Sequence, residues 1–86
     1  MPKVSEFYGI EIGIYYHDHP PPHFHAIYGS DEALIMIPNG EVYRGILPER
    51  GLRIVREWMA LHTDELTDNW DRAERKEPLV PIEPLS

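Results

Sequence analysis

The side chains best suited to chemistry lie in one short segment, which runs from His17 to His25. The segment reads His-Asp-His-Pro-Pro-Pro-His-Phe-His and holds four of the five histidines of the chain. Imidazole binds metal ions and transfers protons near neutral pH. The composition of this segment therefore indicates either a metal site or a site for histidine-dependent proton transfer.

His23 and His25 are the central pair for a metal site. One residue separates them on a predicted strand, so both side chains point to the same face, with Cα atoms about 6–7 Å apart. The residues just before the prolines, His17, Asp18 and His19, could complete three or four ligands, with Glu32 a further candidate, and we expect His19 to be the third ligand. Because the chain has no cysteine, such a site depends on nitrogen and oxygen donors and suits a divalent transition metal such as zinc, nickel, copper, iron or manganese.

Catalysis without a metal is a second interpretation of the same residues. The candidate catalytic residues are His25, His23 and Asp18, since a carboxylate behind an imidazole orients it as a general base. Glu32, which opens the next predicted strand, is an alternative partner for His25. Histidines beside prolines also hydrogen-bond to loop backbone or contact a partner, so the spacing leaves a structural role open.

The elements that must position these residues begin with a sheet in residues 1–47. Alternating apolar residues predict four strands, at residues 7–16, 23–28, 32–37 and 41–47. Asn39-Gly40 predicts a hairpin with a type I′ turn. Every connection is too short for a crossover helix, so we expect an antiparallel meander.

A helical part is predicted for residues 48–76, starting at Pro48. An apolar stripe recurs at spacings of three and four, which is typical of one buried helix face; it comprises Leu52, Val55, Trp58, Met59, His62, Leu66, Trp70 and Ala73. The stripe stays in phase across Thr63, which favours one long helix, kinked there or continuous. Residues 77–86 form an extended, proline-rich tail. We therefore expect a single α+β domain in residues 1–86, with a four-stranded antiparallel meander sheet packed against one long C-terminal helix.

The charge of the chain argues against several classes of partner. The formal net charge is −7, which opposes binding to nucleic acid and to anionic membranes. No apolar run approaches the roughly 20 residues of a membrane span, and no leader-like segment is recognised. We expect a cytoplasmic protein.

Four arginines nevertheless form a local basic group: Arg44, Arg50, Arg53 and Arg56. They indicate either a solvated helix face or a site for an anion or a protein partner. Without interleaved exposed aromatic residues they make a poor nucleic-acid surface. A sheet with one helix could also leave part of the apolar stripe exposed, which favours a protein partner or a homodimer.

Several motifs resemble those of one known family. They are Phe7-Tyr8-Gly9-Ile10-Glu11-Ile12, Asp18-His19 followed by Pro21-Pro22-His23-Phe24-His25-Ala26, Leu47-Pro48, Glu57-Trp58, Leu61-His62, Glu65-Leu66 and Asn69-Trp70. Together they resemble the small prokaryotic family called domain of unknown function 4160. The resemblance implies a bacterial or archaeal protein whose gene often lies beside that of another small domain, in toxin–antitoxin-like pairs. It implies no activity and no catalytic residue.

Two functions of different classes follow. The first is an interaction or regulatory module, one half of a toxin–antitoxin-like pair. The alternative is a metal- or histidine-dependent hydrolase or nuclease that acts through His23 and His25.

Overall fold

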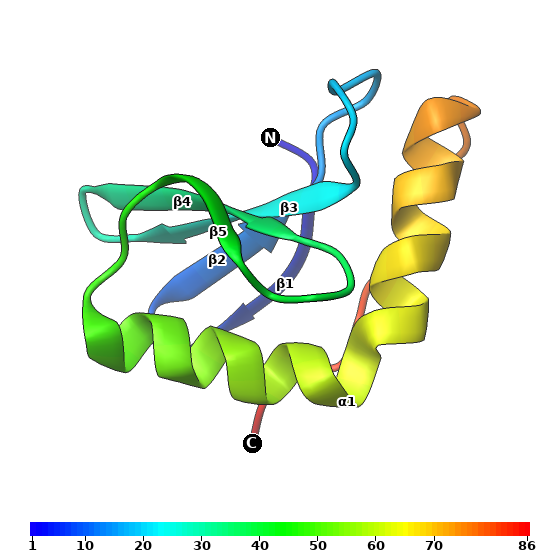
Figure 1. The fold of residues 1–86 in the computed structure, drawn as a ribbon. Helices are drawn as coiled ribbons and strands as arrows, with labels where there is room; N and C mark the ends of the chain where they lie inside the picture. Colours follow the sequence, from blue (N-terminus) through cyan, green and yellow to red (C-terminus); the bar gives the residue numbers. More distant parts are fainter.

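The computed structural model describes residues 1–86 as one antiparallel sheet and one long helix (Figure 1). The elements, in chain order, are β1 (Lys3–Phe7), β2 (Ile10–Gly13), β3 (His23–Tyr28), β4 (Asp31–Met36), β5 (Val42–Gly45) and α1 (Glu49–Glu74). The strands lie in the order β1-β2-β3-β4-β5, and each pairs antiparallel with the next. The predicted α+β class and the meander topology are confirmed.

The sheet has five strands rather than the predicted four. The additional strand is β1, which lies almost wholly before the expected first strand at residues 7–16 and was not predicted; the chain reverses at Tyr8 and Gly9, and only Ile10–Gly13 of the expected strand forms β2. Tyr8 and Gly9 have φ angles of +51° and +79°, and Phe7 pairs with Ile10 directly across the turn. Positive φ at both central positions is the geometry of a type I′ turn.

The expected Asn39-Gly40 hairpin joins β4 and β5, but the turn type was wrong. Only Gly40 has a positive φ angle, of +76°. Asn39 instead accepts a hydrogen bond at its side-chain oxygen from the backbone N–H of Glu41, at 2.9 Å. An asparagine side chain that bonds to the backbone two residues later forms an Asx turn, and the resulting loop is longer than a two-residue turn.

The predicted faces of the strands are confirmed. Ile10, Ile12, Phe24 and Ile35 are fully buried between the sheet and the helix, because alternate residues of a strand point to the same side. The histidines of β3 lie on the opposite face from Phe24.

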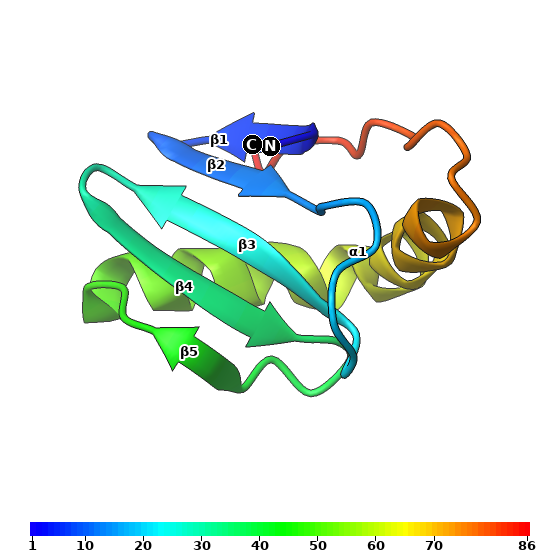
Figure 2. The same ribbon diagram turned by 90° about the horizontal axis from the view of Figure 1, so that it is seen from above.

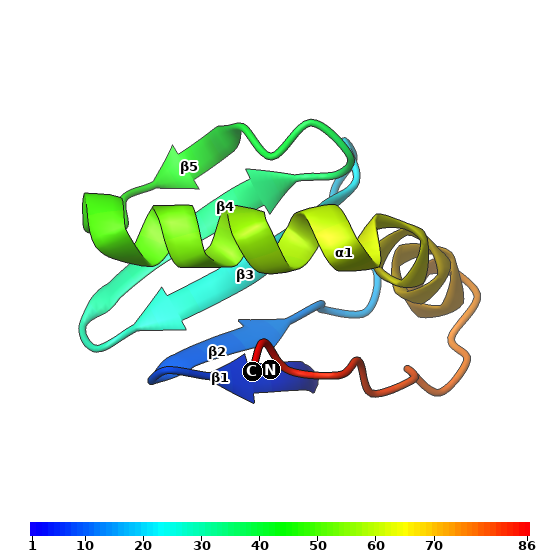
Figure 3. The same ribbon diagram turned by 90° about the horizontal axis from the view of Figure 1, so that it is seen from below.

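Helix α1 covers one face of the sheet and then changes direction (Figures 1 and 3). Its backbone leaves helical geometry at His62, where φ is −133° and ψ is 23°, one residue before the kink that Thr63 suggested. The second half of the helix turns up past the end of β3, beside the loop that leads into that strand (Figure 1).

Most residues of the apolar stripe of the helix are buried within the fold. Six of its members are buried: Val55, Trp58, Met59, Leu66, Trp70 and Ala73. The expectation that part of this stripe would be left for a partner was therefore wrong, because the kink lets both halves of the helix pack against the rest of the chain. The helix is not long and apolar enough to cross a membrane.

The tail after α1 runs back beside β1 (Figures 2 and 3). The backbone N–H of Ile82 donates to the carbonyl oxygen of Val4 at 2.8 Å. The buried Asn69 side chain holds the tail by donating to the carbonyl of Val80 and accepting from its N–H, both at 2.8 Å. The tail thus covers the β1 edge of the sheet, and β5, with all four residues exposed, forms the other edge.

Candidate metal centre

The centre is formed by β3 and the loop before it, which joins β2 to β3. Three consecutive prolines, Pro20 to Pro22, keep this loop out of the sheet, since proline has no backbone N–H to donate to an inner strand ladder. The strand therefore begins at His23, and its alternation brings His23 and His25 to one face. His25 lies between Gly13 of β2 and Leu34 of β4 in the register.

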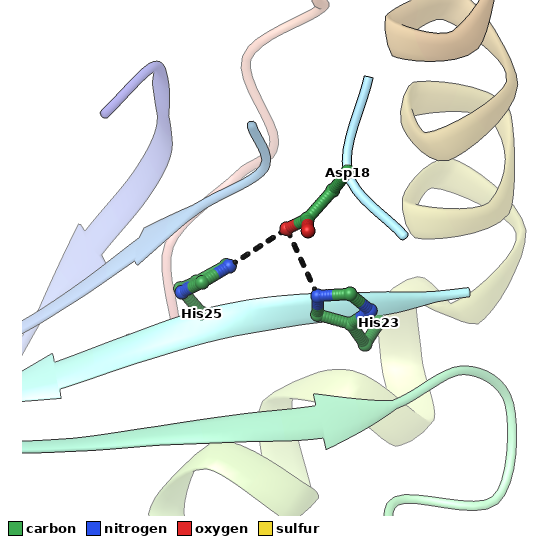
Figure 4. Close-up of side chains that lie close together, drawn as sticks. All are labelled: Asp18, His23 and His25. Carbon is green, nitrogen blue, oxygen red and sulfur yellow. Dashed lines mark hydrogen bonds and ion pairs between the residues drawn. The ribbon is translucent and has the colours of Figure 1, made fainter. Parts of the chain in front are cut away.

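The two rings converge on a single carboxylate (Figure 4). Oδ2 of Asp18 lies 3.0 Å from Nε2 of His23 and 3.0 Å from Nε2 of His25. One ligand atom from each of the three residues lies within 4.8 Å of the other two. A nitrogen–oxygen separation near 3.0 Å suits two ligands that meet at about a right angle, each about 2.0–2.1 Å from a common ion.

The second nitrogen of each ring also has a partner. Nδ1 of His23 donates to the carbonyl oxygen of Pro21 at 2.7 Å, and Nδ1 of His25 donates to Oε2 of Glu32 at 2.9 Å. Metal-binding histidines in proteins almost always donate their other N–H to a carbonyl or a carboxylate, which fixes the tautomer and the ring orientation. Both Nε2 atoms are thereby directed at Asp18.

Proton counting limits what can occupy the position between the rings. An ionised carboxylate only accepts hydrogen bonds, so the contacts to Asp18 require a proton on each Nε2 when no ion is bound. A metal ion would replace both of these protons, while each Nδ1 would keep its proton and donate it to Pro21 or Glu32. The cluster therefore fits either two imidazolium rings or one cation held by two neutral rings and a carboxylate.

The cluster is largely shielded from water. The side chains of His23, His25 and Asp18 are 1%, 10% and 20% exposed. Burial raises the pKa of Asp18, but hydrogen bonds from His25 and the backbone of His19, with the charge and hydrogen bond of His23, outweigh it. The pKa of Asp18 therefore lies below its usual value, and Asp18 is a carboxylate at neutral pH.

The converging group differs from the predicted ligand set in one residue, since Asp18 is present in place of His19. The structure brings His23 and His25 together as expected, but the ring of His19 is not among the converging atoms. His19 is exposed and contributes its backbone N–H, which donates to Oδ1 of Asp18 at 2.8 Å. Asp18, predicted as a catalytic residue, is the third member of the converging group.

The four arginines of the predicted group line three different cavities. Arg44 lines a cavity beside Asp18 and His23, Arg50 and Arg53 line a second cavity next to the tail, and Arg56 lines a third. Arg56 also donates from Nε to the carbonyl oxygen of Gly40 at 2.9 Å.

Three aromatic neighbours of the centre were missed by sequence reasoning. Tyr15 packs edge-on against His25 with ring centroids 4.6 Å apart. Trp70, from the second half of α1, lies 5.2 Å from the His23 ring, and Tyr43 of β5 lies 5.9 Å from it. The sequence predicted that Trp70 is buried on the helix stripe, but not that any of the three rings lies beside the histidines.

Comparison with known proteins identifies the family. The family described as a domain of unknown function (DUF4160) matches residues 9–71 of this chain. The chain belongs to the DUF4160 family. Its matched region contains the whole centre, from Asp18 through Glu32, as well as Trp70. No curated protein and no solved structure matches this DUF4160 chain.

Proposed function

We propose that this protein is a metal-dependent hydrolase whose divalent transition ion is bound by Asp18, His23 and His25. The observation that carries the proposal is the convergence of both Nε2 atoms on one carboxylate oxygen, with each Nδ1 already bonded. A histidine that transfers protons needs a hydrogen-bond partner at only one ring nitrogen, whereas both nitrogens of His23 and of His25 have one here. Two histidines and one carboxylate are a known ligand set for divalent transition metals.

Three protein ligands leave coordination positions for water and substrate, which is typical of catalytic rather than structural zinc sites. A bound ion of this kind lowers the pKa of its water to about 7 and so supplies hydroxide at neutral pH. The residues of the chain hold and orient the ion: Pro21 and Glu32 fix the rings, and burial of His23 keeps water from competing for its nitrogen.

The metal content of the purified protein tests this proposal. Untagged protein prepared without chelator is expected to bind close to one zinc ion per chain, measured by elemental analysis after loading and gel filtration. Asp18→Asn, which keeps the size of the side chain but removes its charge, and His25→Ala are each expected to lose most of the metal. His19→Ala should keep it, because the His19 ring lies outside the centre.

Equal metal content in wild type and Asp18→Asn would contradict the proposed ligand set. Loss of metal in His19→Ala would restore the set predicted from sequence, with His19 as the third ligand. If the folded wild type binds no metal at all, the metal-dependent proposal falls, because the two rings are then the imidazolium pair that the contacts with Asp18 require.

A second candidate function is an interaction module, one half of a toxin–antitoxin-like pair. The observation that favours it is the β5 edge. Val42, Tyr43 and Ile46 are exposed there, and Ile46 keeps 70% of its surface accessible. An uncovered strand edge with apolar side chains is suited to pairing with a strand of another chain.

Co-expression with the small neighbouring protein that the family resemblance implies tests this second candidate. The two proteins should elute together, and Ile46→Glu should abolish the complex, since a charge then replaces an apolar contact. Asp18→Asn should leave the complex intact. Separate elution of the two wild-type proteins would remove the support for this candidate.

A further inference from the structure

A small cavity opens directly beside the candidate metal centre. Its volume is about 150 Å³, and it is lined by Asp18, His19, His23, Leu34, Tyr43 and Arg44. Pockets that enclose a drug-sized ligand have about 300–1,000 Å³, so this cavity accommodates only a small chemical group. Because Asp18 and His23 belong to both the centre and the cavity lining, such a group would lie next to the proposed ion.

An irregularity in the sheet directs two neighbouring residues of β5 to this cavity. Leu34 pairs with Arg44 and Ile35 pairs with Val42, so Tyr43 has no partner of its own on β4. In a regular strand Tyr43 and Arg44 would point to opposite faces. The extra residue forms a β-bulge, a device that commonly redirects a side chain beside a functional site, and both residues line the cavity.

Arg44 is the cation of this cavity that has no carboxylate partner. It forms none of the ion pairs in the structure, and its guanidinium carbon lies 5.9 Å from the centre of the Tyr43 ring. Asp18, the one carboxylate in the lining, is already bonded to both histidines. An ion at the centre would add two positive charges, so with the ion bound this cavity would attract anions although the chain is acidic overall.

From these observations we infer that the cavity binds the phosphate group of a small phosphate ester, which Arg44 would hold beside the proposed metal centre. This inference rests on the proposed hydrolase function and assigns its substrate class. The planar guanidinium group pairs with two phosphate oxygens at once, so Arg44 would neutralise charge on the transferring group. A bound ion would supply further positive charge on the side of Asp18 and His23. In the reaction a water oxygen bonds to phosphorus, the bond to the ester oxygen breaks, and the proton of the water passes to the departing alcohol.

The small volume and the net charge of −7 explain why a small ester is favoured over a nucleic acid. Only one phosphate group fits beside Asp18 and His23, and the rest of a long polyanion would lie against an acidic surface. The substrate's remaining part would extend from the mouth of the cavity toward solvent.

Binding of inorganic phosphate, the common product of such reactions, tests the inference. Phosphate is titrated by calorimetry into zinc-loaded and metal-free protein, for wild type, Arg44→Gln, Arg44→Lys and Arg53→Gln. Arg44→Gln should weaken phosphate binding at least tenfold, and Arg44→Lys should lie between Arg44→Gln and wild type. Arg53→Gln, which removes an exposed arginine from another cavity, should bind as wild type does.

The zinc content of every variant, measured in parallel, separates this inference from the proposed function. If zinc is bound normally but phosphate binds equally to wild type and Arg44→Gln, or not at all, the inference is overturned and the metal centre stands. If no variant binds zinc but metal-free protein binds phosphate in an Arg44-dependent manner, the anion site stands and the metal-dependent function falls.

Discussion

Zinc at about one hundred times its dissociation constant is expected to raise the melting temperature of the protein by about 10–20 °C. An ion that binds only the folded state stabilises it by about 2.7 kcal/mol at that concentration. For a domain of this size each kcal/mol corresponds to about 4–8 °C. The expected rise is this large because Asp18, His23 and His25 come together only in the folded chain. Thermal unfolding followed by circular dichroism, with and without zinc, measures it.

Two variants make this experiment specific to the centre. Asp18→Asn retains the shape of the side chain but should lose most of the zinc-dependent rise, whereas His19→Ala should retain it. Each variant is compared with itself, so a change in its metal-free melting temperature does not obscure the result. An equal rise in Asp18→Asn and wild type would mean that zinc binds elsewhere, for example at exposed histidines such as His17.

The central pair of the candidate site was predictable from local sequence, but its third member was not. The spacing of His23 and His25 on a strand requires that they share a face, and Glu32 was recognised as a partner for His25. The choice between Asp18 and His19 depends on the path of a proline-rich loop, in which His17 has a positive φ angle of +58°. Such a loop has no periodicity from which the direction of its side chains could be read.

The number of strands was missed for a related reason. Apolar alternation continues from Phe7 to Ile14 with little sign of the reversal at Tyr8 and Gly9. A tyrosine with positive φ is uncommon, and the Asn39-Gly40 pair was the stronger local signal for a type I′ turn. Pairing between β1 and β2, together with the tail that covers β1, stabilises a turn that local preference alone does not predict.

The position of Arg44 could not be predicted either. Its neighbours Arg50 and Arg53 follow a helical spacing, and the sequence left open both a solvated helix face and a site for an anion or a protein partner. The bulge at Tyr43 depends on how β5 pairs with β4, and no residue type marks it in the sequence. A one-residue change of register is sufficient to move a side chain from one face of a sheet to the other.

Gly45 of β5 packs against the backbone of Glu32, the residue that bonds to His25 in the candidate metal centre. Its φ angle is +78°, and a Cβ atom there would overlap the carbonyl oxygen of Glu32. Glu32 is the residue whose carboxylate orients His25, and its carbonyl also accepts a hydrogen bond from the N–H of Ile46 at 3.1 Å. The atoms that a methyl group would displace therefore belong to backbone and have little freedom to move.

Gly45→Ala is accordingly expected to lower the free energy of unfolding by about 2–5 kcal/mol. Left-handed backbone costs a non-glycine residue about 1–2 kcal/mol, and an overpacked contact adds about 1–3 kcal/mol. The variant should also weaken zinc binding about 10–100-fold, as loss of a supporting partner of a metal ligand typically does. Urea denaturation and zinc titration of the folded variant measure the two effects.

Gly29→Ala provides the matched control, because Gly29 has a φ angle of +62° but no atom within 4 Å of an added Cβ. In Gly29→Ala only the strained backbone lowers the free energy of unfolding, by about 1–2 kcal/mol. This variant should bind zinc as tightly as wild type. If both alanine variants lose the same stability, the contact with Glu32 contributes nothing. If Gly45→Ala is destabilised but binds zinc normally, Glu32 does not orient His25 through its position in β4, and the centre depends on Asp18 and the two histidines alone.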